Sequence, residues 1–408
     1  MNLLRSRGLG ALITAEVISS FGSQMTYFAL PWFVLKTTGS PARMGVVLAV
    51  ELIPVAVLGI PSGTLVTRIG ARRSMLLADV SRAPLIAAIP LLHAAGILTF
   101  PLLLLLVGLV GCFHAAYFGA QRVVLPELVG EDEQRVGQAN AFVEGGSRLA
   151  SLTGPATAGV LIAALSATAV IYVDAATYLV SFLLVKLFVP QRPRLPGPDE
   201  SGGVLAGLQF VVRDRMLGPM LASVIVANMA GPAMSAGLTV LAYDDFGRSA
   251  RIGGLLFASI GAGALLGVVG VVKLLPHVRP LRLASVAFLV GALSLWVLAL
   301  DVPVALLSLV LATFGAATML VNAPVIGVLT IRTPEALRAK VMAAVITVAT
   351  VAGPLGAAVA GPLIQAHGAR TLLALVAGGM TISALCFGAV VLFRDTEPAA
   401  PLAGEVAP

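Results

Sequence analysis

The sequence predicts an all-α polytopic membrane protein with twelve transmembrane helices. Of its 408 residues, 58% are hydrophobic and only 11% are charged, and the mean hydropathy is +1.00. Soluble proteins carry about 25% charged residues. Apolar segments of about 20 residues or more, each enough to cross ~30 Å of hydrocarbon, recur along the chain. Basic residues gather on alternate connections between these segments. Together these observations exclude a soluble domain.

The predicted spans are separated by polar or Pro/Gly-rich connections. The connection between the ninth and tenth spans, Asp301-Val302-Pro303, is very short. The first span has no small-residue cleavage site behind Arg5 and Arg7, so we expect it to serve as the insertion signal. The spans are predicted at residues 9–35, 42–66, 74–95, 98–120, 137–163, 168–189, 216–242, 252–275, 281–300, 302–330, 341–365 and 369–393.

The distribution of basic residues predicts the orientation. An even number of spans places both termini on one side of the membrane. That side carries 19 of the 26 Lys and Arg residues and the other side carries 5, while Arg82 and Arg148 lie within spans. By the positive-inside rule both termini are cytoplasmic. The net charge of +7 therefore reflects cytoplasmic loops, and no nucleic-acid partner is expected.

The chain divides into two halves of six spans each. We predict an N-terminal bundle over residues 1–190 and a C-terminal bundle over residues 216–394. The segment between them, 191–215, begins as a Pro/Gly/charged linker and becomes amphipathic from about Gly203, which predicts a cytoplasmic surface helix. The tail, 395–408, is acidic and predicted to be disordered.

The two halves repeat one another. Gly39 to Gly45 before the second span matches Gly247 to Gly253 before the eighth, an offset of 208. Pro126-Glu127 matches Pro334-Glu335 at the same offset. Gly154-Pro155 is matched to Gly353-Pro354 with a small shift. A repeat of this length in a membrane chain is typical of transporters built from two related bundles.

The sequence lacks the motifs of enzymes and pumps that use a cofactor. No G-x4-G-K-[ST] phosphate loop or HExxH zinc motif is present. The four histidines show no metal spacing, and both cysteines fall in apolar spans, where we interpret them as packing residues. We therefore expect no metal, no cofactor, no ATP-driven step and no enzyme activity.

The loop after the second span carries a family motif. The segment GTLVTRIGARR resembles the cytoplasmic signature G-x-L-a-D-R-x-G-R-R of the major facilitator superfamily (MFS). Thr67 stands where the family has aspartate, so the resemblance implies a gate that is either weaker or held by another partner, for which Asp79 and Arg82 are nearby candidates. The resemblance implies an MFS fold of two pseudo-symmetric six-helix bundles that works as a monomer. The matching residues are Gly63, Leu65, Arg68, Gly70, Arg72 and Arg73.

The fifth span carries a second motif. Its residues Ala150-x3-Gly154-Pro155-x2-Ala158-Gly159 resemble the antiporter signature G-x3-G-P-x2-G-G, which accompanies exporters in the family. Further phrases, among them YVDAATYL and TPEALRAKVM, resemble the branch of macrolide efflux proteins and the enterobactin exporter. The resemblance implies efflux, by multidrug-resistance-type transport through a bacterial-type inner membrane, of drugs, macrolide-like metabolites or siderophores.

Buried charges indicate where protons could be handled, because charges within a bilayer are costly. Glu51 lies ~13 Å into the second span, near the midplane. Glu144 and Arg148, four residues apart, share a face of the fifth span. Glu16 lies ~12 Å into the first span. We expect these carboxylates to compete for protons and for Arg148, with helix packing as the alternative role. Asp174 is interpreted as a brace between helices.

The second half has few buried charges and is expected to offer an apolar wall for substrate. Adaptable Met and aromatic side chains suit varied amphipathic ligands. The alternatives to an exporter are an MFS importer or uniporter, or a non-transporting membrane sensor or scaffold. The candidate substrate-cavity residues are Phe21, Met25, Tyr27, Phe113, Tyr117, Asn228, Met229 and Asn322.

Overall fold

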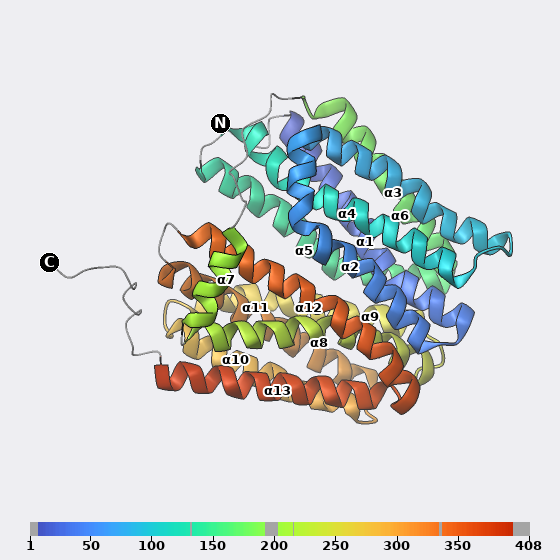
Figure 1. Cartoon of the computed structure of the whole chain (residues 1–408). Helices are drawn as coiled ribbons and strands as arrows, with labels where there is room; N and C mark the ends of the chain where they lie inside the picture. The colour runs from blue at the N-terminus through green and yellow to red at the C-terminus, as the bar shows by residue number, and fades with distance from the viewer. Residues whose placement is uncertain (1–6, 131–132, 192–202, 215, 334–336, 395–408) are drawn as a thin grey trace.

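The structure, a computed structural model, is described for residues 7–130, 133–191, 203–214, 216–333 and 337–394, and these residues form helices and no strand (Figure 1). The element order is α1(Arg7–Thr38), α2(Pro41–Ile69), α3(Ala71–Ala94), α4(Phe100–Val129), α5(Glu133–Ala164), α6(Ala167–Phe188), α7(Gly203–Arg213), α8(Leu217–Asp244), α9(Ala250–Leu274), α10(Pro280–Ser294), η2(Leu295–Ala299), α11(Val304–Arg332), α12(Arg338–His367) and α13(Ala369–Arg394).

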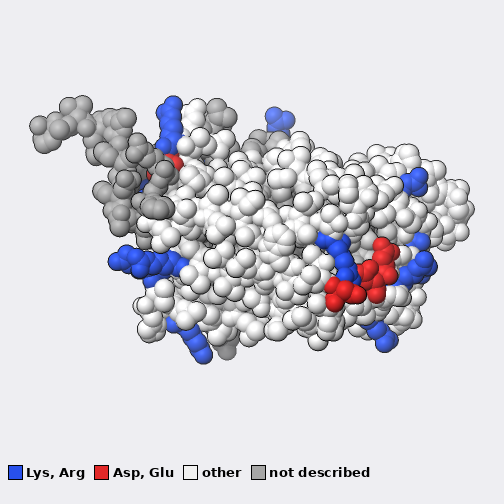
Figure 2. Space-filling view, turned by 90° about the horizontal axis from the view of Figure 1, so that it is seen from below, with Lys and Arg blue, Asp and Glu red and all other residues white. Residues whose placement is uncertain are grey.

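Thirteen of these elements form twelve membrane helices, since α10 and η2 together make one span. Among the described residues, ten helices are long and apolar enough to cross a membrane by length and composition. Helices α1 and α5 are more polar, but each has 32 residues, or ~48 Å at 1.5 Å per residue. Figure 2 shows a face on which charged side chains gather toward the two ends and leave an uncharged band between them. The predicted fold class is confirmed.

Helices α1 to α6 pack on one another, and helices α8 to α13 do the same (Figure 1). The short helix α7 matches the predicted amphipathic helix. It lies against α12 and buries Val211 beside Leu329 and Val341. The predicted linker residues 192–202 and the tail 395–408 lie outside the described residues. We call the end of the bundle where α1 begins and α13 ends the terminal side, and the opposite end the far side.

The repeat shifts by one residue at the far side. Gly39 and Gly247 both have φ of +62°, as the offset of 208 predicts. However, the side chain of Ser40 caps α2 and that of Ser249 caps α9, an offset of 209. The extra residue is Arg248, a non-glycine residue with φ of +61°. The predicted ungapped match of this motif is therefore corrected to one with a single insertion.

The halves meet at two helix crossings near the far side. Helix α2 packs on α12, and α5 packs on α9. A Cβ added at Gly45 would lie 2.7 Å from the Cα of Gly361, and one added at Gly159 would lie 2.8 Å from the Cα of Gly254. Real Cβ atoms essentially never approach so closely. Small residues therefore let these backbones touch.

Aromatic pairs join the halves at the same end. Phe28 of α1 packs edge-on against Phe257 of α9 with ring centroids 5.3 Å apart. Trp32 of α1 packs against Tyr243 of α8 at 5.4 Å. These rings and the two glycine crossings close the interface between the halves on the far side.

The counterpart of Gly154 in the second half is Gly356, and the predicted match to Gly353 is wrong. A Cβ at Gly154 would overlap Gln24 of α1, and a Cβ at Gly356 would overlap Met229 of α8. Five residues later, Gly159 and Gly361 make the two crossings between the halves. The common offset is thus 202. In the sequence, Gly353 resembles the counterpart of Gly154 because both are followed by proline, whereas Gly356 is followed by alanine.

Candidate functional site

A central cavity of about 520 Å³ lies between the two halves. Helices α1, α2, α3, α4 and α6 supply one wall, and α8 and α12 supply the other. Its volume falls within the ~300–1,000 Å³ of small-molecule sites. Among the described residues that line it, none is lysine or arginine. The polar lining residues are Ser23, Gln24, Thr26, Tyr27, Glu51, His114, Asp174, Tyr178, Asn228 and Thr350.

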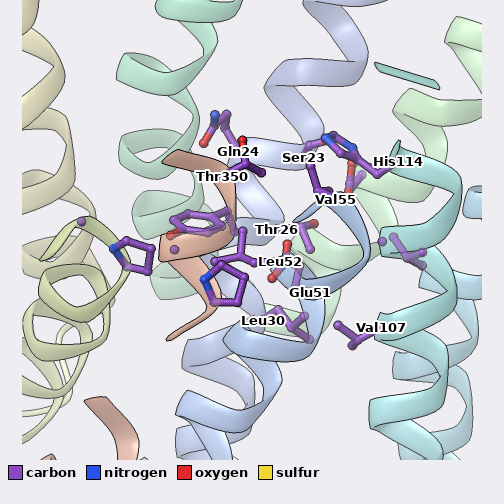
Figure 3. A pocket seen from close by; sticks show the side chains of 18 of the residues that line it. Ser23, Gln24, Thr26, Leu30, Glu51, Leu52, Val55, Val107, His114 and Thr350 are labelled. Atoms are coloured by element: carbon purple, nitrogen blue, oxygen red, sulfur yellow. The ribbon is translucent and has the colours of Figure 1, made fainter. Parts of the chain in front are cut away.

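Two carboxyl groups face this cavity. Figure 3 shows Glu51 of α2 beside Thr26 of α1, with Ser23, Gln24 and His114 together at one end. Oε2 of Glu51 and Oδ2 of Asp174 are buried and have no hydrogen-bond partner among the residues that the structure describes. Asp174 has no exposed surface, and it is close enough to Glu51 to interact electrostatically. Burying such groups without partners is costly, so both are candidates for the functional site.

A vestibule of about 620 Å³ continues from the central cavity toward the terminal side. Ser23, Gln24 and His114 line both spaces, so the two adjoin. The vestibule is lined from α1, α3, α4 and α5. Its carboxyl groups are Glu16 and Glu144. The vestibule thus lies between the central cavity and the terminal side, whereas the two halves touch closely at the far side.

The predicted acidic residues of the vestibule differ in their surroundings. Glu16 is 7% exposed, accepts a hydrogen bond from Ser20 at 3.3 Å, and keeps Oε2 without a partner. Glu144 pairs with Arg148 at 2.8 Å, as their spacing predicts, but both side chains are more than half exposed. Arg82 is close enough to Glu16 to interact with it electrostatically. Arg148 instead forms its ion pair with Glu144.

Arg82 lies in the core of the first half. Its guanidinium stacks between the rings of Tyr117 and Tyr178, with distances of 4.5 and 4.2 Å to their centroids. It pairs with Asp79 at 2.5 Å, and Asp79 accepts a hydrogen bond from Ser181 of α6 at 2.7 Å. One guanidinium nitrogen also lies 3.3 Å from Nδ1 of His114. Asp79 and Arg82 therefore join α3, α4 and α6 within one half.

The loop motif mainly joins helices within the first half as well. Gly63 lies in α2, and Gly70, with φ of +95°, is the single residue between α2 and α3. Arg72 donates from Nε to the carbonyl of Val189 at 2.6 Å and from a terminal nitrogen to that of Lys186 at 2.8 Å. It thereby satisfies carbonyls at the end of α6. The side chains of Arg68 and Arg73 are exposed.

The antiporter motif occupies a junction of three helices. Gly154 touches α1, and Gly159 touches α9 of the other half. Pro155 lies within α5, and its carbonyl would lie 2.8 Å from a Cβ on Gly254. The predicted close packing of this segment is thus seen at the interface between the halves.

The structure separates the predicted cavity residues into those that line one of three spaces and those that pack between helices. Tyr27 and Asn228 line the central cavity, Tyr117 lines the vestibule, and Asn322 lines a further space in the second half. Met25 is fully buried in the core. Phe21 and Phe113 are partly buried and pack on the hydrophobic cores, and Met229 lies in the close α8–α12 contact at Gly356.

Comparison with known proteins decides the family. The Major Facilitator Superfamily profile matches residues 12–357. The chain belongs to this superfamily. It is 27% identical over 397 residues to the multidrug efflux pump Tap of Mycolicibacterium fortuitum, with 94% of each chain covered. It is 26% identical to Tap of Mycobacterium tuberculosis, covering 95% of this chain and 93% of that one.

Solved structures agree on the fold. The nucleoside transporter NupG (D323A mutant) matches with a TM-score of 0.76 at 15% identity, covering 93% of this chain and 99% of that chain. A bacterial homologue of the human lysosomal transporter Spinster, in an inward-facing and unoccupied conformation, matches with a TM-score of 0.73 at 14% identity, covering 96% of both. This MFS protein is therefore a multi-pass membrane transporter of a small-molecule substrate, not a member of an enzyme family. The expectation of efflux agrees with the named relatives.

Proposed function

We propose that this MFS protein is a proton-coupled exporter, an antiporter of amphipathic small molecules that works by alternating access. The observation that carries the proposal is the pair of carboxyls that line the central cavity, Glu51 and Asp174, each of which has one buried oxygen without a hydrogen-bond partner among the described residues. A proton on either group would remove its charge and change how it holds a substrate. The export direction is supported by the relatives named as multidrug efflux pumps.

The proposed orientation places both termini in the cytoplasm of a bacterial-type cell, with the protein in the inner membrane as a monomer. The terminal side is then cytoplasmic, and the vestibule admits substrate from the cell interior. The bundles 1–190 and 216–394 would rock about the central cavity. Opening the far side would require separating the crossings at Gly45 and Gly159.

Each carboxyl has a proposed role. Glu51 carries the proton, since it lies on α2, the helix that packs against α12 of the other half. Asp174 shares this site with Glu51, and this proposed role stands in place of the bracing role that the sequence predicts. Glu16 and Glu144 line the vestibule, where they would relay protons or attract a positively charged substrate. The acidic central cavity, whose described lining includes no Lys or Arg, favours a substrate with a cationic head group.

The test is substrate-dependent proton movement in proteoliposomes with a panel of drugs and siderophores. We expect one or more compounds to drive proton flux in the unmodified protein, and Glu51→Gln to abolish it. Asp301→Asn is the control, because this carboxyl lies at the far-side surface and is 90% exposed. Transport that survives collapse of the proton gradient would contradict proton coupling.

A further inference from the structure

A separate side cavity of about 190 Å³ lies inside the second half. It is enclosed by α8, α10, α11 and α13, so it lies within one bundle and not between the two. Its lining residues are mainly aromatic, methionine and aliphatic: Met220, Val224, Ala227, Phe288, Gly291, Ala292, Phe314, Ala317, Val321, Val325, Met380 and Phe387, with the polar residues Ser223, Asn228, Thr318 and Asn322.

The polar groups of the side cavity are largely satisfied by the protein itself. The hydroxyl of Ser223 donates to the carbonyl of Ser383, and that of Thr318 donates to the carbonyl of Phe314 at 2.9 Å. The amide nitrogen of Asn228 donates to the carbonyl of Val224 at 2.9 Å. A ligand here therefore meets rings and alkyl groups more than free donors, which favours an apolar occupant.

The side cavity adjoins the central cavity. Ala227 and Asn228 of α8 line both. A molecule that reaches from Glu51 and Asp174, on the opposite wall, into the second half would therefore pass Asn228. The acidic groups lie at one end of this path, and the aromatic groups lie at the other.

Size limits what the side cavity can take. An engineered apolar cavity of roughly 150 Å³ binds benzene. The 190 Å³ found here therefore suits one six-membered ring or a branched alkyl group of similar volume. A pair of fused rings requires the lining to move.

We propose that the side cavity binds a single-ring apolar substituent of the transported molecule while its positively charged head stays beside Glu51 and Asp174. This inference rests on the proposed function and names the substrate class: a cationic amphiphile with one ring-sized apolar group. The side cavity, by its volume, then sets which substituents are accepted.

The first test compares two probes on the purified full-length protein in nanodiscs. Tetramethylammonium supplies the head group alone, and benzyltrimethylammonium adds one ring. We expect the benzyl probe to bind roughly 30-fold more tightly in the unmodified protein, because burial of the ring adds apolar contact. In Val321→Phe, whose new ring fills the side cavity, we expect this ratio to fall near one. Ile326→Phe is the matched control, since Ile326 lies on the same helix and is 51% exposed.

A second variant enlarges the side cavity instead of filling it. Phe314→Ala removes a lining ring, and we expect a 1-naphthylmethyl-trimethylammonium probe to gain at least ~10-fold in affinity over the unmodified protein. Both binding gains are measured without proton flux, so a failure of proton coupling does not move them. No benzyl gain in the unmodified protein, or a benzyl gain that persists in Val321→Phe, overturns the inference.

Discussion

Gly159 of α5 faces Gly254 of α9 so closely that a Cβ on either residue would lie within 3 Å of the other's Cα. Gly45 and Gly361 make the equivalent contact between α2 and α12. The two contacts are related by the repeat, at offsets of 209 and 202. Together they hold the far side of the transporter shut without a side chain at either point of contact.

We expect Gly254→Val to open the far side. Overpacking a tight contact costs about 1–3 kcal/mol, which corresponds to a roughly 5- to 150-fold shift between two conformations. The measurement is labelling of a cysteine introduced at Leu30, a central-cavity residue, by an impermeant maleimide applied from the far side. The background lacks Cys112 and Cys386. Gly388→Val is the control, since a Cβ there meets nothing within 4 Å; equal labelling in both variants would contradict the assigned closure.

Asp174→Asn should lower transport by at least ~10-fold while the protein remains folded, if the charge of Asp174 serves the site. The substitution keeps an oxygen for the hydroxyl of Thr177, which lies 3.3 Å from Oδ1. Thr177→Val is the matched control, because it removes that hydroxyl and keeps the charge. Transport assays in proteoliposomes decide the matter: a larger loss in Thr177→Val than in Asp174→Asn would return Asp174 to a bracing role.

Arg82→Met should lower the free energy of unfolding by about 3–5 kcal/mol, because it leaves Asp79 buried and unpaired. The double variant Asp79→Leu with Arg82→Met should recover part of that loss, since the unpaired charge is gone. Thermal unfolding in detergent measures both. Arg148→Met removes an exposed pair and should change stability by less than ~1 kcal/mol. Equal effects at Arg82 and Arg148 would show that the stacked arginine is not a structural centre.

Arg72→Ala should destabilise the first half by about 1–3 kcal/mol, because two charge-assisted hydrogen bonds to the end of α6 are lost. Arg72→Lys should recover part of this, since a lysine reaches one carbonyl but lacks the forked guanidinium. The adjacent Arg73→Ala is the reference, as the Arg73 side chain is exposed. Thermal unfolding of the three variants is the measurement, and an equal loss in Arg73→Ala would rule out the capping role.

The helices could be predicted from the sequence because a membrane fixes both their length and their polarity. Gly70, Asp301 and Gly368 mark connections that the sequence shows directly. The exact repeat was harder to see, since Gly353-Pro354 resembles Gly154-Pro155 more than Gly356-Ala357 does. Which glycine touches another helix depends on helix rotation, and that rotation is set by packing.

The site could be predicted only in part, because the sequence shows how deep a residue lies along a span but not which way its helix is turned. The depth of Glu51 follows from its distance along the span, and the structure places it at the central cavity. The sequence offers Arg82 and Asp79 as candidates for the gate, and their spacing of three residues indicates one helix face. That Tyr117 and Tyr178 enclose Arg82 depends on two other helices, α4 and α6. Asp174 is expected to brace helices because the sixth span lies at the bundle periphery in the resembled fold, and no sequence pattern shows which way α6 is turned.

The glycine contacts at the far side also bear on how such a transporter can change its cargo. The glycine contacts that close the far side do not involve the side chains that line the substrate path. Residues such as Val321 or Phe314 can then be exchanged, and new molecules admitted, without rebuilding the seal that keeps the membrane tight. Selectivity and leak-tightness are therefore separable traits in this architecture.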